Sequence, residues 1–202
     1  RNDGKVFYKN ALPNEIPQMS VGLLLDESGS MCSCDRCTYA RSSAIILYDF
    51  CKALHIPVTV YGHSTGGNSV ELYSYAEFES IDNDDKYRMM DIAARGSNRD
   101  GAALRFVAEQ LVKRPEEVKI LILVSDGQPA APGYYGSAAE EDLRGIRQEY
   151  RRKGVLFIAA AIGEDKQNIE RIYGDSFMDI TDLNQLPVKL TGSDLRAVDS
   201  DL

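Results

Sequence analysis

The sequence has little that would suit a membrane protein or a nucleic-acid-binding protein. No apolar run approaches the ~20 residues that a helix needs to cross a bilayer. Lysine and arginine number 23 against 31 aspartates and glutamates, which gives a net charge of −8. Nucleic-acid binders usually have a basic surface, so we expect neither nucleic acid nor a membrane as a partner.

Motifs of the common catalytic classes are also missing. The sequence has no Gly-x-Ser-x-Gly and no Walker A loop, and its two histidines belong to no recognisable nucleophile motif. A magnesium-dependent phosphohydrolase would need a nucleophilic carboxylate with a lysine nearby, and we find no such set. We therefore predict that the chain is not an enzyme and has no catalytic residue.

Cysteines are few and clustered. Three of the four, Cys32, Cys34 and Cys37, fall within six residues, and the fourth is Cys51. A secreted disulfide framework normally spreads its cysteines to link distant loops, and the first residues lack the basic and apolar segments of a secretory signal. This pattern indicates a reducing compartment, and we predict a cytoplasmic protein.

The cysteine cluster has two interpretations. Cys32, Cys34 and Cys37 could bind zinc or an iron–sulfur cluster, but zinc usually takes four ligands. Cys51 falls on the apolar face of a predicted helix, so we expect it in the core. We favour reduced surface thiols, and the sequence leaves metal binding by them open.

Hydrophobic patterning predicts alternating strands and helices. Continuous apolar runs at 21–25, 119–124 and 155–162 are typical of strands buried on both faces of a parallel sheet. Strict alternation at 70–75 predicts a strand with one exposed face at a sheet edge. Other expected elements are helices at 40–54, 104–111, 138–152 and 169–173, a short helix within 82–92, strands at 58–61 and 178–181, a turn-rich stretch at 63–68, and a C-terminal helix.

This alternation predicts an α/β fold with a doubly wound, mostly parallel sheet, helices on both faces and one antiparallel edge strand. We expect an irregular lead-in at 1–18, a single domain at 19–192 and a polar tail at 193–202. In such sheets, ligands bind beyond the carboxyl ends of strands, where the strand order reverses. Residues at those ends are therefore the candidates for a functional site.

Three loops expected at these strand ends have oxygen-bearing side chains. The candidates are Asp26, Ser28 and Ser30 in the first loop, Asn98 and Asp100 in the second, and Asp126 in the third. An all-oxygen set suits Mg²⁺, with Mn²⁺ or Ca²⁺ as alternatives. Neutral hydroxyl ligands would leave the ion enough charge to accept a carboxylate from another molecule. Simple hydrogen-bonded turns are the other interpretation, which three such loops make less favourable.

The spacing Asp26-x-Ser28-x-Ser30 after one buried strand, with Ser125-Asp126-Gly127 after another, resembles the metal-ion-dependent adhesion site of von Willebrand factor A (VWA) domains. The resemblance extends roughly from residue 19 to residue 190. It implies a Rossmann-like VWA fold and a docking role, in which a Glu or Asp of a partner protein completes the coordination of the ion.

Four segments are similar to two bacterial groups of proteins. They are residues 7–13, 24–31 (LLDESGSM), 100–105 (DGAALR) and 125–129 (SDGQP). These are the nitric-oxide-reductase activation (D-type) proteins and the T-type subunit of aerobic cobaltochelatase. Both groups are understood to work with a ring-forming AAA+ ATPase. The resemblance therefore implies a MoxR-like AAA+ ATPase or its target as partner. The alternative is an accessory subunit of a cobalt or magnesium chelatase that inserts metal into a tetrapyrrole in cobalamin synthesis.

The second loop departs from the family pattern. The family normally places a threonine hydroxyl there, and counting back from Gly101 puts Asn98 at that position. Asp100, two residues on, is the alternative ligand, and it would place more negative charge on the ion. We favour Asn98 and retain Asp100. Two further residues of interest are His63, expected just past a strand and more often structural, and the Tyr134–Tyr135 pair as an aromatic contact near the ion.

Overall fold

The computed structural model describes residues 18–179 except 34, 80–81, 128 and 162–165. The expected polar tail, the C-terminal helix and all but Gln18 of the expected lead-in lie outside the described residues. The domain boundaries therefore stay a prediction.

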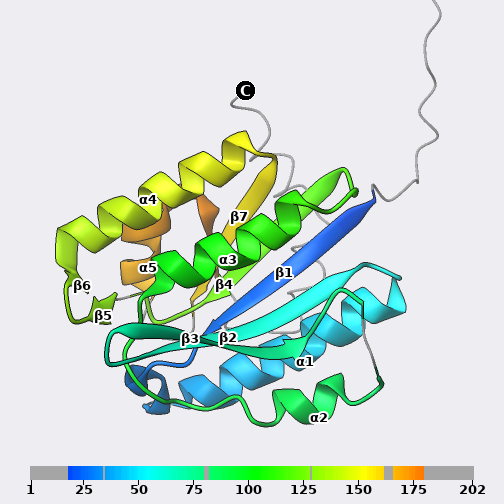
Figure 1. The fold of residues 1–202 in the computed structure, drawn as a ribbon, viewed down its shortest axis with the longest axis horizontal. Coiled ribbons are helices and arrows are strands. Elements are labelled where there is room, and N and C mark those ends of the chain that lie inside the picture. Colours follow the sequence, from blue (N-terminus) through cyan, green and yellow to red (C-terminus); the bar gives the residue numbers. More distant parts are fainter. Residues whose placement is uncertain (1–17, 34, 80–81, 128, 162–165, 180–202) are drawn as a thin grey trace, which may run out of the picture.

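The described part of the chain forms a six-stranded sheet in the order β3-β2-β1-β4-β7-β8 (Figure 1). All neighbouring strands are parallel except the pair β2 and β3, which is antiparallel and leaves β3 at an edge. The predicted mostly parallel sheet with one antiparallel edge strand is confirmed. The strands are β1 (Met19–Asp26), β2 (Val58–Gly66), β3 (Ser69–Ala76), β4 (Val118–Val124), β7 (Val155–Ala161) and β8 (Phe177–Asp179).

Helices cover both faces of the sheet (Figure 1). One face packs against α1 (Arg36–Ala53) and α2 (Asp85–Met89), and the other against α3 (Asp100–Val112), α4 (Gly136–Arg152) and α5 (Lys166–Tyr173). In β1, Leu23 and Leu25 belong to the first core and Leu24 to the second. Both faces of β1 are thus apolar, which explains its continuous hydrophobic run. Among the described helices, none is both long and apolar enough to cross a bilayer.

Two local predictions need correction. The stretch 63–68 was expected to be a turn, but β2 continues to Gly66, which pairs with Ser69. The ladder with β3 supplies partners for this polar segment, so tertiary pairing overrides its turn-like composition. The short antiparallel pair of β5 (Ala130–Ala131) and β6 (Tyr134–Tyr135) was not predicted.

The direction of strand addition reverses at β1. The chain passes from β1 through α1 to β2 on one side, and later through α3 to β4 on the other side. In the register of β1 with β4, Leu25 is opposite Val124. The loops that follow these two strands therefore leave the same edge side by side, at the position where open α/β sheets bind ligands.

Candidate metal site

Asp26, the last residue of β1, connects the three predicted loops. The prediction that all three follow strands is wrong for the second, which lies between α2 and α3. Its side chain is 1 % exposed, and Oδ1 accepts a hydrogen bond from the Ser28 backbone N–H at 2.8 Å. Oδ2 accepts from Ser125 Oγ at 2.9 Å and from the amide nitrogen of Asn98 at 3.1 Å. Burial, with the nearby charge of Asp100, raises the pKa of Asp26. The structure thus brings residues from sequence-distant loops to one carboxylate.

The two serine hydroxyls of the first loop lie together. Ser28 Oγ and Ser30 Oγ are 3.0 Å apart, and Ser28 is buried whereas Ser30 is exposed. A short 3₁₀ helix, η1 (Gly29–Cys32), begins between them, and the Gly29 N–H donates to the Gly96 carbonyl at 2.6 Å. The first loop therefore presents two hydroxyl oxygens between the buried Asp26 and solvent.

Asn98 and Asp100 differ in which atoms face this cluster. The backbone N–H of Ala130 donates to Asn98 Oδ1 at 2.6 Å. Because a backbone N–H can only donate, the amide oxygen must face Ala130, and the amide nitrogen then faces Asp26 and Asp100. That nitrogen is 3.1 Å from Asp26 Oδ2 and 3.4 Å from Asp100 Oδ2. Of the two second-loop alternatives, Asp100 is the one with an oxygen directed toward the cluster.

His63 lies within β2, not past its end, and is opposite Asp26 in the strand register. It is fully buried, and its Nε2 lies 3.1 Å from Asp100 Oδ1. Burial alone would lower the pKa of His63, but the contact with Asp100 and the charges of Asp26 and Glu27 outweigh it and raise this pKa. The imidazole is therefore a fully buried neighbour of the Asp100 carboxylate, and it pairs with that carboxylate when protonated.

Glu27 is a residue of the site that the sequence analysis did not single out. Its fully buried carboxylate accepts from Tyr75 Oη at 2.5 Å and from Arg95 Nε at 2.7 Å. Gly62 is needed beside it, since a Cβ there would lie 1.7 Å from Glu27 Oε1. The available signal was an acidic residue next to the end of a buried strand. Glu27 fixes the first loop against β3 and the segment before Asn98.

The third loop is held in a tight turn after β4. Ser125 Oγ, which donates to Asp26, also accepts the Gly127 N–H at 3.0 Å. Gly127 has φ +82°, a conformation that favours glycine, and a Cβ there would lie 2.6 Å from Ile169 Cδ1. Asp126 lies between these two residues and is 7 % exposed. This turn places the predicted Asp126 on the loop that contacts Asp26.

The donor set of this edge fits a hard cation. The buried carboxylates of Asp26, Asp100 and Asp126 and two adjacent hydroxyls are the kind of oxygen ligands that Mg²⁺ and Ca²⁺ prefer. Within the described residues, no group of three His, Cys, Asp or Glu side chains has an arrangement suited to a metal. A metal at this edge would therefore depend on the hydroxyls of Ser28 and Ser30 as well as on the carboxylates.

The cysteines lie in different surroundings. Cys32 is exposed, Cys37 is half-buried, and both are free thiols, while Cys34 lies outside the described residues. Cys51 lies on the buried face of α1, as predicted, and burial raises its pKa to about 12. Among the described residues, the thiols are not gathered into a metal-binding group.

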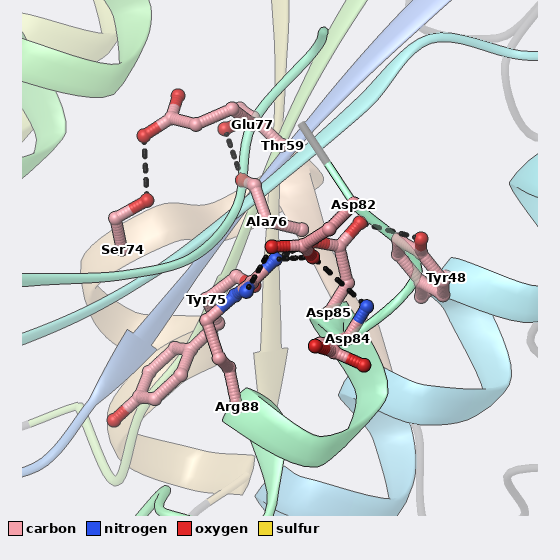
Figure 2. A network of polar contacts seen from close by, with 10 residues as sticks. All are labelled: Tyr48, Thr59, Ser74, Tyr75, Ala76, Glu77, Asp82, Asp84, Asp85 and Arg88. Atoms are coloured by element: carbon pink, nitrogen blue, oxygen red, sulfur yellow. Dashed lines mark hydrogen bonds and ion pairs between the residues drawn. The ribbon is translucent and has the colours of Figure 1, made fainter. Parts of the chain in front are cut away.

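A second acidic cluster lies between β3 and α2 (Figure 2). Arg88 donates to Asp82 at 2.8 Å and also contacts Asp85, whose Oδ2 accepts from Tyr48 Oη at 2.6 Å. Arg88 Nε additionally donates to the Tyr75 carbonyl at 3.2 Å. Tyr75, Asp82, Asp85 and Arg88 help to line a cavity of about 200 Å³. Each of the two aspartates has a cationic or hydroxyl donor, which marks a structural network.

Comparison with known proteins identifies relatives of the chain. The family model described as the cobalamin biosynthesis protein CobT VWA domain matches residues 86–193. Protein YojO of Bacillus subtilis (strain 168) is 26 % identical over 197 residues, covering 91 % of this chain and 30 % of YojO. Protein NorD of Brucella suis biovar 1 is 34 % identical over 95 residues, covering 46 % of this chain and 15 % of NorD. The chain thus spans less than a third of the length of these relatives.

Solved structures show the same fold at low sequence identity. The von Willebrand factor type A structure from Catenulispora acidiphila matches with TM-score 0.61 and 17 % identity, over 89 % of this chain and 43 % of that one. The SpRpn10 VWA domain matches with TM-score 0.57 and 16 % identity, over 87 % of this chain and 95 % of that domain. These likenesses show a VWA fold.

Proposed function

Because this chain belongs to the family of the cobalamin biosynthesis protein CobT VWA domain, we propose that it is a divalent-cation-dependent module that docks onto another protein. The observation that carries this proposal is the convergence of three loops on Asp26. Its carboxylate holds Ser28 of its own loop, Asn98 of the second and Ser125 of the third within 3.1 Å.

The ion would be Mg²⁺, with Mn²⁺ or Ca²⁺ as alternatives. We assign Ser28, Ser30 and Asp100 as its direct ligands, with Asp26 and Asp126 acting through water. Asn98 would position the two carboxylates through its amide nitrogen. A bound ion supplies a positive charge that attracts a Glu or Asp of the partner, and the exposed Ser30 marks the open side.

We assign the chain an accessory role without catalysis, in the activation or assembly of a target protein. The proposed partner is a MoxR-like AAA+ ATPase or the target that this ATPase remodels, and the relationship to NorD supports this choice. The second candidate is an accessory role in a cobalt or magnesium chelatase. The match to a family described by cobalamin biosynthesis favours this second candidate.

A pull-down from lysate tests the docking proposal. The 202-residue chain, its Asp26→Ala variant and the control Asp82→Ala are each compared with excess Mg²⁺ and with EDTA, read by mass spectrometry. The proposal expects an AAA+ ATPase or its target to be recovered only with Mg²⁺, and only by wild type and Asp82→Ala. Recovery of a large chelatase subunit would favour the second candidate. Identical recovery with EDTA, or a phosphatase activity lost in Asp26→Ala, would overturn docking.

A further inference from the structure

Arg99 differs from most arginines of the described chain in its surroundings. Six other arginines lie within 4 Å of a carboxylate, whereas Arg41 donates to the Ile92 carbonyl. The six are Arg88, Arg95, Arg105, Arg114, Arg144 and Arg171. Within the described residues, Arg99 has no such ion pair, and its Nη2 donates instead to the Pro132 carbonyl at 2.6 Å. Among the described residues, no acid therefore pairs with this charge, in a protein whose net charge is −8.

Arg99 belongs to the second loop of the candidate metal site, and its guanidinium bonds to the β5–β6 hairpin. Asn98 and Asp100, the residues on either side, both belong to the cluster around Asp26. The β5–β6 hairpin that holds Arg99 through Pro132 is itself attached to this loop, since Ala130 donates to Asn98. The Arg99 Cζ also lies 5.8 Å from the centre of the Tyr134 ring.

Such a group is suited to receive an anion. Arg99 is half-buried, its bond to Pro132 lies at the surface, and its buried Nε has no hydrogen-bond partner among the described residues. A preorganised guanidinium binds carboxylates with little further loss of side-chain entropy, and a partly desolvated position strengthens the attraction. A structural role alone would be served by the single bond to Pro132.

We infer that Arg99 is a second anchor of the docking surface, and that the partner segment has two acidic residues, one for the ion and one for Arg99. This inference rests on the proposed docking function and specifies the partner's chemistry. It explains how an acidic chain could select an acidic segment, because a positive charge lies on the same loop as the proposed ligand Asp100. Like-charge repulsion from the rest of the surface would disfavour segments that cannot reach both anchors.

Synthetic peptides test this inference on the 202-residue chain. One twelve-residue peptide contains a single glutamate, and a series of equal length contains a second glutamate one to five residues away. Binding in excess Mg²⁺ at 0.15 M NaCl is followed by NMR chemical-shift titration. The variants are Arg99→Gln, Arg99→Lys, and Arg144→Gln as a control with the same change in net charge; their thermal unfolding confirms that each is folded.

We expect the best two-glutamate peptide to bind about tenfold more tightly than the one-glutamate peptide, as for one charge-assisted pair. Arg99→Gln should remove this gain, so that both peptides bind this variant with equal affinity. Arg99→Lys should keep part of the gain, and Arg144→Gln should keep all of it. A gain that survives Arg99→Gln, or an equal loss for both peptides, would overturn the inference.

The same titrations separate this inference from the docking function. Mg²⁺-dependent binding of the one-glutamate peptide, without a gain from the second glutamate, would overturn the inference alone. An Arg99-dependent gain that persists in EDTA would support the acidic anchor and count against the metal. If neither peptide binds, both proposals fail.

Discussion

The two acidic clusters of this protein contain similar side chains in opposite electrostatic situations. Between β3 and α2, Arg88 and Tyr48 neutralise or hydrogen-bond the aspartates, and the hydrogen bonds from Arg88 lower the pKa of Asp82. At the carboxyl ends of β1 and β4, Asp26 and Asp100 form the cluster that we call the edge cluster. Both are 1 % exposed, and the pKa of Asp26 is raised by burial and by Asp100. The number of carboxylates in a cluster is therefore a poor guide to function. Whether cationic groups in the chain balance their charge is a better guide.

Burying an uncompensated carboxylate costs several kcal/mol, so a protein normally provides a cation or donors for it. In the network around Arg88, the chain itself supplies these groups, because Arg88 and Tyr48 donate to the aspartates. At the β1–β4 edge, the donors are neutral hydroxyl and amide groups, together with the buried His63. A divalent cation would complete the compensation there, and this contrast supports the proposed metal site.

The largest effect is expected from removing the central carboxylate of the edge cluster. Asp26→Ala should weaken Mg²⁺ binding by about 100-fold or more, at or above the upper end of the 10–100-fold losses seen for outer-shell partners of metal ligands. Isothermal titration calorimetry measures this, and Asp82→Ala is the matched control. Unchanged Mg²⁺ affinity in Asp26→Ala would remove the distinction between the two clusters.

Magnesium itself should stabilise the fold through the edge cluster only. At 100 times its Kd, Mg²⁺ should add about 2.7 kcal/mol to the free energy of unfolding, because it binds the folded state alone. Urea denaturation with and without Mg²⁺ measures this increase. Wild type and Asp82→Ala should gain stability equally, whereas Asp26→Ala should gain none. An equal gain in Asp26→Ala would place the ion elsewhere.

In the cluster of Asp82, Asp85 and Arg88, a substitution should lower stability and leave Mg²⁺ affinity unchanged. Asp85→Ala removes a buried acceptor of Tyr48 and Arg88 and should lower the free energy of unfolding by about 2 kcal/mol. Its Mg²⁺ affinity in the folded state should match that of wild type. Asp84→Ala, at an exposed neighbour, should change stability by less than about 0.5 kcal/mol. Loss of Mg²⁺ binding in Asp85→Ala would show that the clusters are coupled.

The smallest effect is expected from a substitution of Glu27, which holds the first loop of the edge cluster through Tyr75 and Arg95. Glu27→Gln keeps the side-chain shape but removes the charge that pairs with Arg95. We expect Mg²⁺ affinity to fall about tenfold, the size typical of outer-shell changes, measured by calorimetry. Glu71→Gln, which alters an acid on β3 that accepts from Tyr73, is the control and should leave the affinity unchanged. An unchanged Mg²⁺ affinity in Glu27→Gln would mean that the first loop keeps its shape without the Glu27–Arg95 ion pair.

Much of the fold could be predicted because buried strands and helices have a characteristic local spacing of apolar residues. The apolar runs of β1, β4 and β7 and the alternation in β3 correspond to strands buried on two faces or one. The buried position of Cys51 follows from helical spacing in the same way. The ends of β1 and β4 indicated two loops that would share an edge, and Ser125 of the β4 loop does donate to Asp26. The loop of Asn98 also reaches Asp26, but it lies between α2 and α3 and not at a strand end.

By itself, the sequence determined which apolar runs form buried strands, that the loops after β1 and β4 leave the same edge of the sheet, and which oxygen donors they contain, since each depends on periodicity and strand order. Only the tertiary structure decided how individual donors are oriented. The oxygen of Asn98 faces Ala130, 32 residues away, and His63 and Glu27 are fixed by contacts with Asp100 and with Tyr75 and Arg95. Such orientations depend on partners distant in the chain, and no local pattern encodes them.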